Sequence, residues 1–592
     1  MEIRNIAIIA HVDHGKTTLV DALLRQSGTN LGKLTETDDL IMDSNDLERE
    51  RGITIFSKNA SVMYKGVKIN IIDTPGHADF GGEVERVLKM ADGALLLIDA
   101  QEGPMPQTRF VLKKALEQKL KIIVVINKID KKNARVHYVL EKTFELFIDL
   151  GATDEQINFP IIYAASKLGK AGKENTLEAM QDIKPLFETI LEEIPPPIAH
   201  ATEPFQMHVV ALAYDNYKGK IAIGRIYKGN VKQGETIMHI NREGKQTFSK
   251  ITALMTFSGL ERIEVPLVQS GDIAAIAGID HIHIGDTLCS RDKADPLPLI
   301  DIEPPTVKMT FAVNKSPFAG QEGQYCTSRN IRERLYKELD SDVALKVEEG
   351  KTADEFIVSG RGELHLAILI EKMRREGYEL EVSRPEVILH QDEKGITLEP
   401  VEEVWLEVPE KYAGIVIEKM GKRKGEIKTM KVEHGITYFH FTIPTRGLIG
   451  YRNEFTMDTR GLGMINTLFA GFKPLVGEIV RNPHGSLIAF EYGKSNTYGL
   501  LNAQERGELF IGHGVDVYKG QVVGQHAKPE DIEVNVCKTK RLSNMRSKGE
   551  GPSESLIPPR QMSLEQAIEY IGDDELVEVT PHSIRIRKKN LS

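Results

Sequence analysis

Cysteine is scarce in this chain of 592 residues, which contains only Cys289, Cys326 and Cys537. They lie far apart and form no pair at metal-ligand spacing, so the sequence predicts neither a disulfide framework nor a cysteine metal site. Long apolar runs are also missing. Residues 94–98 and 122–126 are runs of five, whereas a membrane helix needs about 20 apolar residues. We therefore expect reduced thiols and no membrane partner.

A signal peptide is not indicated, because the first apolar strand is expected to begin at Ile3, and this favours a cytoplasmic location. The hydrophobic fraction is 41% and the charged fraction 27%, which is typical of a folded globular protein. The length predicts about four domains of roughly 150 residues. The net charge of −10 argues mildly against nucleic-acid binding, so contact with RNA would need local basic patches.

A phosphate-binding loop is predicted where the apolar run at residues 6–9 leads into A-H-V-D-H-G-K-T-T at residues 10–18. In such a loop the backbone N–H groups face the phosphates, Lys16 reaches the β and γ oxygens, and the Thr17 hydroxyl binds Mg²⁺. The consensus has glycine where Ala10 stands, so this motif alone leaves open a simple glycine turn before an amphipathic helix. The residues expected to bind phosphate are Asp13, His14, Gly15, Lys16, Thr17, Thr18 and, from a later motif, Gly76.

Two motifs that could sense the γ-phosphate follow in the sequence. The strand expected at residues 67–72 ends in D-T-P-G-H, where Asp73 can complete the Mg²⁺ shell and the Gly76 N–H can bond the γ-phosphate. Upstream, R-G-I-T-I at residues 51–55 follows a polar stretch with little periodicity. A loop that becomes ordered only when Thr54 meets Mg²⁺ and the γ-phosphate would be a switch. The expected Mg²⁺ ligands are Thr17, Thr54 and Asp73.

A guanine-reading motif, N-K-I-D at residues 127–130, follows the apolar run 122–126. The carboxylate of Asp130 can accept hydrogen bonds from guanine N1–H and from the 2-amino group, which adenine cannot supply. Each motif alone could be an ordinary turn or loop. Four of them in this order, each at the end of a predicted strand, favour GTP as the bound nucleotide.

These four motifs together resemble those of the translational GTPases, the class of elongation factors Tu and G. The resemblance implies a fifth loop touching guanine at residues 165–167, although Lys167 departs from the small apolar residue usual there. The residues that would contact guanine are Asn127, Lys128, Asp130, Ser166 and Lys167.

The resemblance also assigns a catalytic position to His77, where a side chain can orient the attacking water. Taken alone, a histidine after a turn is more often a surface residue. Val12 and Ile53 would flank it as a hydrophobic gate. Because positioning and electrostatics suffice for phosphoryl transfer, we do not expect His77 to be a general base. No arginine finger is evident in the sequence, so the resemblance implies slow intrinsic hydrolysis and activation by ribosomes.

The predicted fold is multidomain: an α/β P-loop GTPase domain, a β-barrel, two α+β ferredoxin-like domains and a mainly β C-terminal domain. Strands and helices alternate up to about residue 194, and glycines then recur between β-branched runs, as in a small barrel. The second α+β segment follows the first. In the third domain, residues 359–365 resemble a turn of elongation factor G and are expected to lead into a helix whose face carries Leu366, Ile370 and Met373. The expected boundaries are 1–200, 201–300, 301–392, 393–477 and 478–592.

The tail narrows the resemblance to one family. Elongation factor G has a large inserted domain between its third and fifth domains, whereas only residues 385–400 separate the equivalents here. The tail beyond Val476 and the stretch 444–452 are similar to those of the BipA/TypA family of ribosome-associated bacterial GTPases. The resemblance implies a monomer that binds the 70S ribosome, touching rRNA and the A-site tRNA acceptor end, or 50S assembly intermediates.

Three basic clusters are candidate RNA contacts, although charge runs are usually only solvated. The stretch 538–548 contains no acidic residue, and the resemblance places it near the tRNA acceptor end. The third cluster could instead be a solubilising terminus. The clusters comprise Lys538, Lys540, Arg541, Arg546 and Lys548; then Lys419, Lys422, Arg423 and Lys424; and finally Arg585, Arg587, Lys588 and Lys589.

Two alternatives remain open on the sequence. One is a back-translocating elongation factor of the LepA type, which also lacks the inserted domain but has a different tail. The other is an assembly factor that uses GTP as a latch, with little ribosome-stimulated turnover. Assembly and elongation roles would use the same switch and the same RNA-facing surface.

Overall fold

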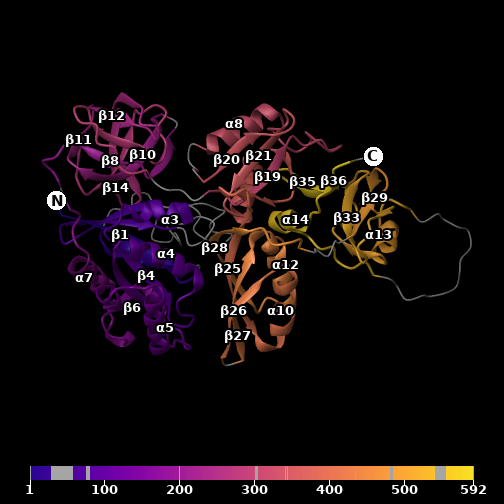
Figure 1. Ribbon diagram of the computed structural model, residues 1–592, viewed down its shortest axis with the longest axis horizontal. Helices are drawn as coiled ribbons and strands as arrows, with labels where there is room; N and C mark the ends of the chain where they lie inside the picture. Colours follow the sequence, from indigo (N-terminus) through magenta and orange to yellow (C-terminus); the bar gives the residue numbers. More distant parts are fainter. Residues whose placement is uncertain are drawn as a thin grey trace, which may run out of the picture. The chain divides into compact units, whose positions relative to one another are not determined.

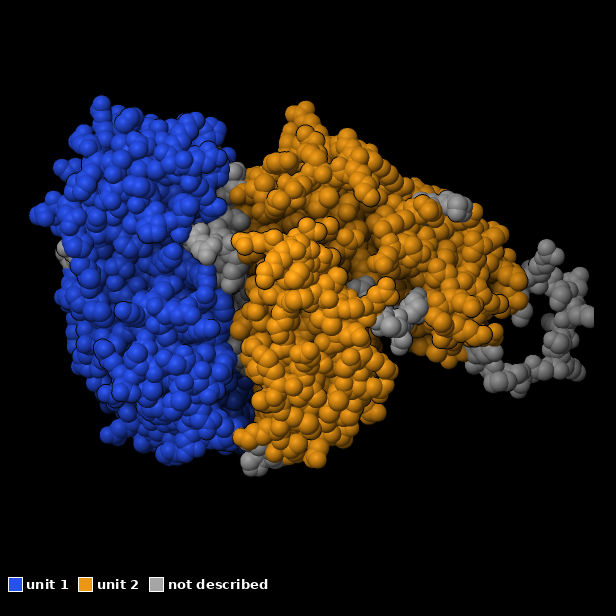
Figure 2. Space-filling view, in the orientation of Figure 1, with its two compact units in different colours: residues 1–303 blue, residues 304–592 orange. Residues whose placement is uncertain are grey.

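The computed structural model describes residues 2–11, 13–28, 58–74, 81–198, 200–215, 217–299, 304–339, 342, 344–433, 435–479, 485–539 and 555–590. The chain divides into two compact units, residues 1–303 and residues 304–592 (Figure 1, Figure 2). Within the described ranges no helix combines the length and the apolar character needed to cross a membrane.

A seven-stranded sheet forms the first part of unit 1, in the order β2-β3-β1-β4-β5-β6-β7. Its inner strands are parallel, while β2 and β7 are antiparallel at the edges. Parallel sheets are covered on both faces, so their strands are nearly continuous apolar runs. The strands are β1 Ile3–Ala10, β2 Lys58–Tyr64, β3 Val67–Asp73, β4 Gly93–Asp99, β5 Lys121–Asn127, β6 Ile161–Ala165 and β7 Lys170–Gly172.

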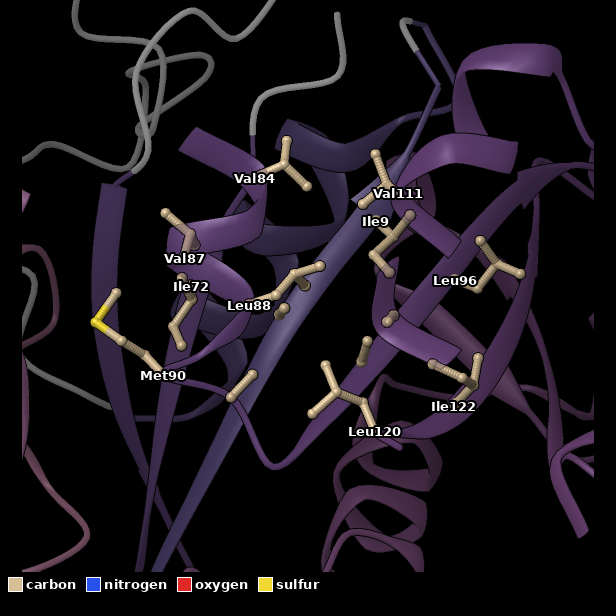
Figure 3. Packing of buried hydrophobic residues seen from close by; sticks show 14 of the residues in the cluster. Ile9, Ile72, Val84, Val87, Leu88, Met90, Leu96, Val111, Leu120 and Ile122 are labelled. Atoms are coloured by element: carbon tan, nitrogen blue, oxygen red, sulfur yellow. The ribbon is translucent and has the colours of Figure 1, made fainter. Parts of the chain in front are cut away.

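Helices cover both faces of this sheet, which confirms the predicted α/β domain. They are α1 Lys16–Gln26, α3 Gly81–Leu88, α4 Pro106–Glu117, α5 Val136–Asp149, α6 Asp154–Ile157 and α7 Lys184–Glu193. Alternate residues of β1 join two separate cores: Ile9 packs with Val87 of α3 and Val111 of α4 (Figure 3), whereas Ile8 belongs with Leu19 of α1 and residues of α7.

Antiparallel strands in the second part of unit 1 form the predicted barrel. They are β8 Gln206–His208, β9 Ala211–Asp215, β10 Gly219–Lys228, β11 Asn230–Lys232, β12 Thr236–Ile240, β13 Gln246–Lys250, β14 Ala253–Ser258, β15 Glu261–Glu264, β16 Leu267–Gln269, β17 Ile273–Ala277 and β18 Thr287–Ser290. Strand β10 pairs first with β9 and then with β8. Gly224 lies near this change, where a Cβ would be 1.8 Å from the His208 carbonyl oxygen. Glycine permits that close approach.

A buried polar network, which we call the barrel junction, joins the barrel to the first sheet. Lys68 Nζ of β3 lies 2.9 Å from both carboxylate oxygens of Asp272 and 2.6 Å from the Thr256 hydroxyl. Asn70 of β3 donates to Asp272 at 3.0 Å and to Asn5 of β1 at 2.8 Å. The same two strands therefore carry the phosphate loop and Asp73 at one end and the barrel contacts nearer the other.

Unit 2 begins with an α+β segment in which the sheet order β20-β21-β19-β22 is ferredoxin-like. Its elements are β19 Val307–Ala312, α8 Ser328–Glu338, β20 Lys346–Glu349, β21 Glu355–Gly360, α9 Glu363–Arg375, β22 Leu380–Val382 and β23 Glu386–Val387. Leu366, Ile370 and Met373 of α9 are buried, as expected, and residues 359–362 lead into that helix.

The second α+β segment has the same strand–helix–strand–strand–helix–strand order. It consists of β24 His390–Gln391, β25 Thr397–Pro409, α10 Ala413–Lys422, β26 Glu426–Glu433, β27 Ile436–Pro444, α11 Thr445–Leu448, α12 Tyr451–Asp458 and β28 Met464–Pro474. Strand β25 pairs with both β27 and β28, and β26 lies outside β27. This arrangement confirms a second ferredoxin-like domain.

The C-terminal segment is mainly β, as predicted, and it shares a sheet with the first α+β segment. Its elements are β29 Gly485–Ala489, β30 Gly493–Lys494, α13 Thr497–Gln504, β31 Gly507–Leu509, β32 Asp516–Val517, β33 Gln521–His526, β34 Ile532–Val534, α14 Leu564–Tyr570, β35 Glu575–Val579 and β36 Ile584–Lys588. Strand β22 pairs with β35, so one eleven-stranded sheet runs from β20 to β34. We call the β22–β35 pairing, together with the ion pair between Arg587 and Glu381, the ladder junction.

Candidate functional site

The loop between β1 and α1 is held close to the end of β5. Gly15 has a φ of +94°, and a Cβ added to it would lie 2.5 Å from Asn127 Nδ2. Both the left-handed backbone and the close approach require glycine here. Lys16 begins α1 and is buried, and Thr17 and Thr18 follow in the first helical turn. The local sequence thus builds the strand–loop–helix geometry of a phosphate cradle.

Asp73 lies beside this loop because β1 and β3 pair in parallel and end at the same edge of the sheet. Lys16 Nζ is 2.9 Å from Asp73 Oδ1 and also donates to the Thr74 carbonyl. The Thr74 hydroxyl donates to the Ile8 carbonyl at 2.6 Å, which fastens the end of β3 to β1. The structure therefore brings together the lysine and the aspartate of two separate predicted motifs.

Asn127 connects three loops. Its Nδ2 donates to the His14 carbonyl at 2.9 Å, and its Oδ1 accepts from the Ser166 amide at 3.0 Å and from the Ser166 hydroxyl at 2.8 Å. Asp130 and Lys167 are exposed at the same end of the sheet. Residues of the phosphate, N-K-I-D and 165–167 loops are thus brought together.

Two carboxylates that the sequence analysis missed support these loops. Burial raises the pKa of Asp99, but hydrogen bonds from Lys128, the Gln101 amide and Lys131 outweigh it and lower the pKa to about 2. Glu102 lies 3.4 Å from His14 Nε2, and the His14 hydrogen bond lowers the pKa of Glu102. The available signal was position, because Asp99 directly follows the apolar run 94–98 and Glu102 comes shortly after it, at the sheet edge where the other motifs lie.

Several predicted site residues fall outside the described residues, and the structure neither supports nor contradicts their roles. They are Val12, Ile53, Thr54, Gly76, His77, Lys540, Arg541, Arg546 and Lys548. Of the predicted RNA contacts, Lys538 is described, and it is exposed.

Comparison with known families covers nearly the whole chain. The matching family models are the elongation factor Tu GTP binding domain at residues 1–196, elongation factor Tu domain 2 at 219–289, elongation factor G domain III at 326–384, the elongation factor G C-terminus at 396–483 and the TypA/BipA C-terminal domain at 484–592.

Full-length relatives agree with these matches. The chain is 52% identical to a protein of Synechocystis named large ribosomal subunit assembly factor BipA, over 99% of this chain and 98% of that protein. Identity to the proteins of the same name from Bacillus subtilis and Escherichia coli K12 is 48% and 50%, over 100% of this chain and 96% and 97% of those proteins. This chain belongs to the BipA/TypA family. It is a GTPase.

A solved structure supports the fold of this BipA/TypA family member. A crystal structure of a Thermus thermophilus protein superimposes with a TM-score of 0.56 at 18% identity, covering 80% of this chain and 97% of that one. At that identity the likeness shows the multidomain fold alone.

The second basic cluster of this BipA/TypA protein is largely neutralised by carboxylates. Lys419 Nζ lies 2.7 Å from Asp458, and Arg423 lies 2.8 Å from Glu454. Lys422 lies 2.6 Å from Glu418 on the same helix. The cluster therefore offers much less free positive charge to RNA than its sequence indicates.

Three residues of the third basic cluster, Arg585, Arg587 and Lys588, form ion pairs within the folded sheet, so the cluster as a whole is not a solubilising terminus, although Lys589 is exposed. Arg587 is 3% exposed and is paired with Glu381. Arg585 lies 3.0 Å from the buried Glu578, and Lys588 Nζ is 2.9 Å from both Asp574 and Glu575. Alternation along β36 places Arg585 and Arg587 on one face, where they meet Glu322 and Glu381 from far earlier in the chain, and this is why the linear charge run was misleading.

Proposed function

We propose that this GTPase binds the 70S ribosome in its GTP form, hydrolyses GTP there, and acts in assembly of the large subunit, in translation under stress, or in both. The observation that carries the proposal is the Asn127 contact, which holds the phosphate loop against the two guanine loops. The name of the relatives, large ribosomal subunit assembly factor, favours a role in 50S assembly.

In this proposal the nucleotide lies over the loop that precedes α1. Backbone N–H groups and the positive end of α1 bind the phosphates, and Lys16 provides a point charge at the β and γ oxygens. Asp130 reads guanine, and Asn127 positions its loop. The phosphate contacts are Asp13, His14, Gly15, Lys16, Thr17, Thr18 and Gly76, and the guanine contacts are Asn127, Lys128, Asp130, Ser166 and Lys167.

The residues present fit a Mg²⁺ ion. Asp73 is a buried carboxylate beside Lys16, and Thr17 provides a hydroxyl in the adjacent helical turn. Mg²⁺ prefers such oxygen ligands, and in nucleotide sites it takes one or two protein ligands plus phosphate oxygens. Thr17, Thr54 and Asp73 would hold the ion, which would neutralise charge on the β and γ oxygens.

Hydrolysis is proposed to proceed by in-line attack of water on the γ-phosphorus. His77 orients the water, with Val12 and Ile53 as a hydrophobic gate that keeps the histidine away until ribosomal RNA draws it in. Lys16 and the loop N–H groups stabilise the charge that builds up on the transferring phosphoryl group. Slow intrinsic turnover and strong stimulation by ribosomes follow.

The tail is proposed to anchor the protein on RNA. Lys538 is exposed at the start of the basic stretch, and the cluster comprises Lys538, Lys540, Arg541, Arg546 and Lys548. Such residues can neutralise a few phosphates near the A-site tRNA acceptor end or in rRNA. The protein is proposed to be a cytoplasmic monomer.

The deciding measurement is the GTP hydrolysis rate with and without purified 70S ribosomes. We expect strong stimulation, and we expect His77→Ala to reduce the stimulated rate by about 100-fold or more while sparing GTP affinity. Loss of GTP binding in that variant would contradict the assigned role. No stimulation of the wild type would favour the latch alternative, in which GTP binding controls docking on an immature subunit.

A tail variant separates anchoring from triggering. Replacing Lys540, Arg541 and Arg546 by alanine should weaken ribosome binding while leaving stimulated hydrolysis at saturating ribosomes. Replacing the exposed Lys113, Lys351 and Lys394 by alanine removes the same charge elsewhere and is the matched control. Equal weakening by both triple variants would contradict a specific anchor. A LepA-like role would show instead as back-translocation of pre-positioned tRNA.

A further inference from the structure

A buried aspartate connects the guanine loop with the phosphate loop. Asp99 ends β4 and is fully buried. Its Oδ1 accepts from the Gln101 amide at 2.7 Å, while its Oδ2 lies 2.8 Å from Lys128 Nζ and 3.1 Å from Lys131 Nζ. The carboxylate thus holds the ammonium of a lysine that belongs to the N-K-I-D motif.

Lys128 is the bridge between the two loops. Its ammonium donates to the Asp13 carbonyl in the phosphate loop as well as to Asp99. Its backbone has a φ of +60°, a left-handed conformation that is uncommon for lysine. Because a lysine side chain is long and flexible, holding its head at one point costs entropy that a fixed partner must offset.

We propose that Asp99 is a positioning residue for guanine-nucleotide binding. It holds the Lys128 ammonium against the Asp13 carbonyl and so keeps the phosphate loop and the guanine loop in a fixed position relative to each other. This inference rests on the proposed nucleotide site. Asp99 acts through Lys128 and does not itself touch the nucleotide, so GDP and GTP should be affected equally.

The low pKa of Asp99, about 2, means that its charge is present throughout the neutral range. Titration of Asp99 should therefore not change the positioning effect between about pH 6 and pH 8. A role that depended on partial protonation of this carboxylate would change across that range.

The test is a double-mutant cycle on the full chain, measured by titration with a fluorescent GDP. Asp99→Asn keeps the shape but removes the charge, and Lys128→Met removes the ammonium. We expect each single variant to weaken GDP and GTP binding by about 10- to 100-fold, as for loss of a charged hydrogen bond. Because both changes break the same link, the double variant should bind no more weakly than the weaker single variant.

Lys131→Met is the matched control, because it removes the other ammonium that contacts Asp99 and should change affinity by less than about 3-fold. Asp99→Glu keeps the negative charge and so avoids leaving the lysines without a counter-charge, which could cause misfolding. Because the carboxylate is displaced, nucleotide binding should still weaken. Urea unfolding of each variant reports stability separately.

The outcomes are distinct. If the wild type binds guanine nucleotide and the Asp99 variants bind it with the same affinity, the positioning role is overturned. Additive losses of affinity in the double variant would overturn it as well. In both cases the proposed function would stand. A wild-type chain that binds no guanine nucleotide would overturn both. A loss for Lys131→Met equal to that for Lys128→Met would also contradict the inference.

Discussion

The barrel junction and the ladder junction each join two segments that are matched by different family models, but the two junctions do so by different means. At the barrel junction the principal links are side chains: Lys68 and Asp272, 4% and 5% exposed, with Asn70 and Thr256 around them. At the ladder junction a backbone pairing of β22 with β35 lies beside the ion pair of Arg587 with Glu381.

The difference shows where each connection is vulnerable. A buried side-chain network depends on every partner, because one missing group leaves a charge or a donor unsatisfied. A strand ladder depends on backbone groups that most substitutions leave intact. We therefore expect single substitutions to weaken the barrel junction more than the ladder junction.

The largest expected effect is at Asp272, which accepts hydrogen bonds from Lys68, Asn70 and Thr256. Asp272→Ala should destabilise unit 1 by about 3–5 kcal/mol, because Lys68 would remain buried without its counter-charge. Urea-induced unfolding measures the change. Asp292→Ala, at an exposed barrel position, is the control. A loss below about 1 kcal/mol would show that the network is dispensable.

Arg587→Met should lower the free energy of unfolding of unit 2 by about 3 kcal/mol, which is less than the loss expected for Asp272→Ala in unit 1. Glu381 would remain buried, but it would keep the hydrogen bond from the Lys315 amide, and the β22–β35 pairing would persist. The same unfolding measurement compares this value with that of Asp272→Ala. A larger loss for Arg587→Met than for Asp272→Ala would reverse the comparison of the two junctions.

Ser61→Ala removes a side-chain hydrogen bond that lies beside a backbone bridge within unit 1. The Ser61 hydroxyl donates to the Phe257 carbonyl at 2.6 Å, while the backbones of Ser61 and Gly259 exchange two hydrogen bonds. Because that backbone bridge survives, the substitution should cost only about 1 kcal/mol in urea unfolding. A loss of stability as large as that for Asp272→Ala would contradict the view that the backbone bridge carries this contact.

An effect of similarly small size is the pH dependence at Glu322. Burial raises its pKa, but hydrogen bonds from Thr580 and Arg585, with a further one from Ser583, outweigh it and lower the pKa below 4.5. A carboxylate with a lowered folded-state pKa stabilises above its unfolded pKa and loses that contribution as pH falls through the folded value.

Glu322→Gln should therefore be less stable than the wild type at pH 7, by about 1 kcal/mol because the site is partly exposed. The difference should persist down to about pH 4.5 and vanish as the pH falls further. Unfolding curves across this range measure it, with the exposed Glu393→Gln as control. A difference that grew on acidification would have the wrong sign.

Much of the site could be predicted because its signals are local. The turn at Gly15, the strand end at Asp73 and the run before Asn127 are short patterns whose chemistry follows from neighbouring residues. The face of α9 with Leu366 and Ile370 was likewise readable from helical spacing. Asp99 was missed because its importance depends on Lys128, which reaches it only when β4 and β5 lie side by side.

By itself, the sequence determined the order of the domains and the membership of the BipA/TypA family, and it predicted which loops bind phosphate and guanine, because these signals lie in residues close together in the chain. Tertiary structure alone decided that Asn127 ties His14 to Ser166, and that Arg587 is buried against Glu381. Such contacts join residues far apart in sequence. They exist because strand pairing and burial of a common core bring their backbones together, and no local pattern records that pairing.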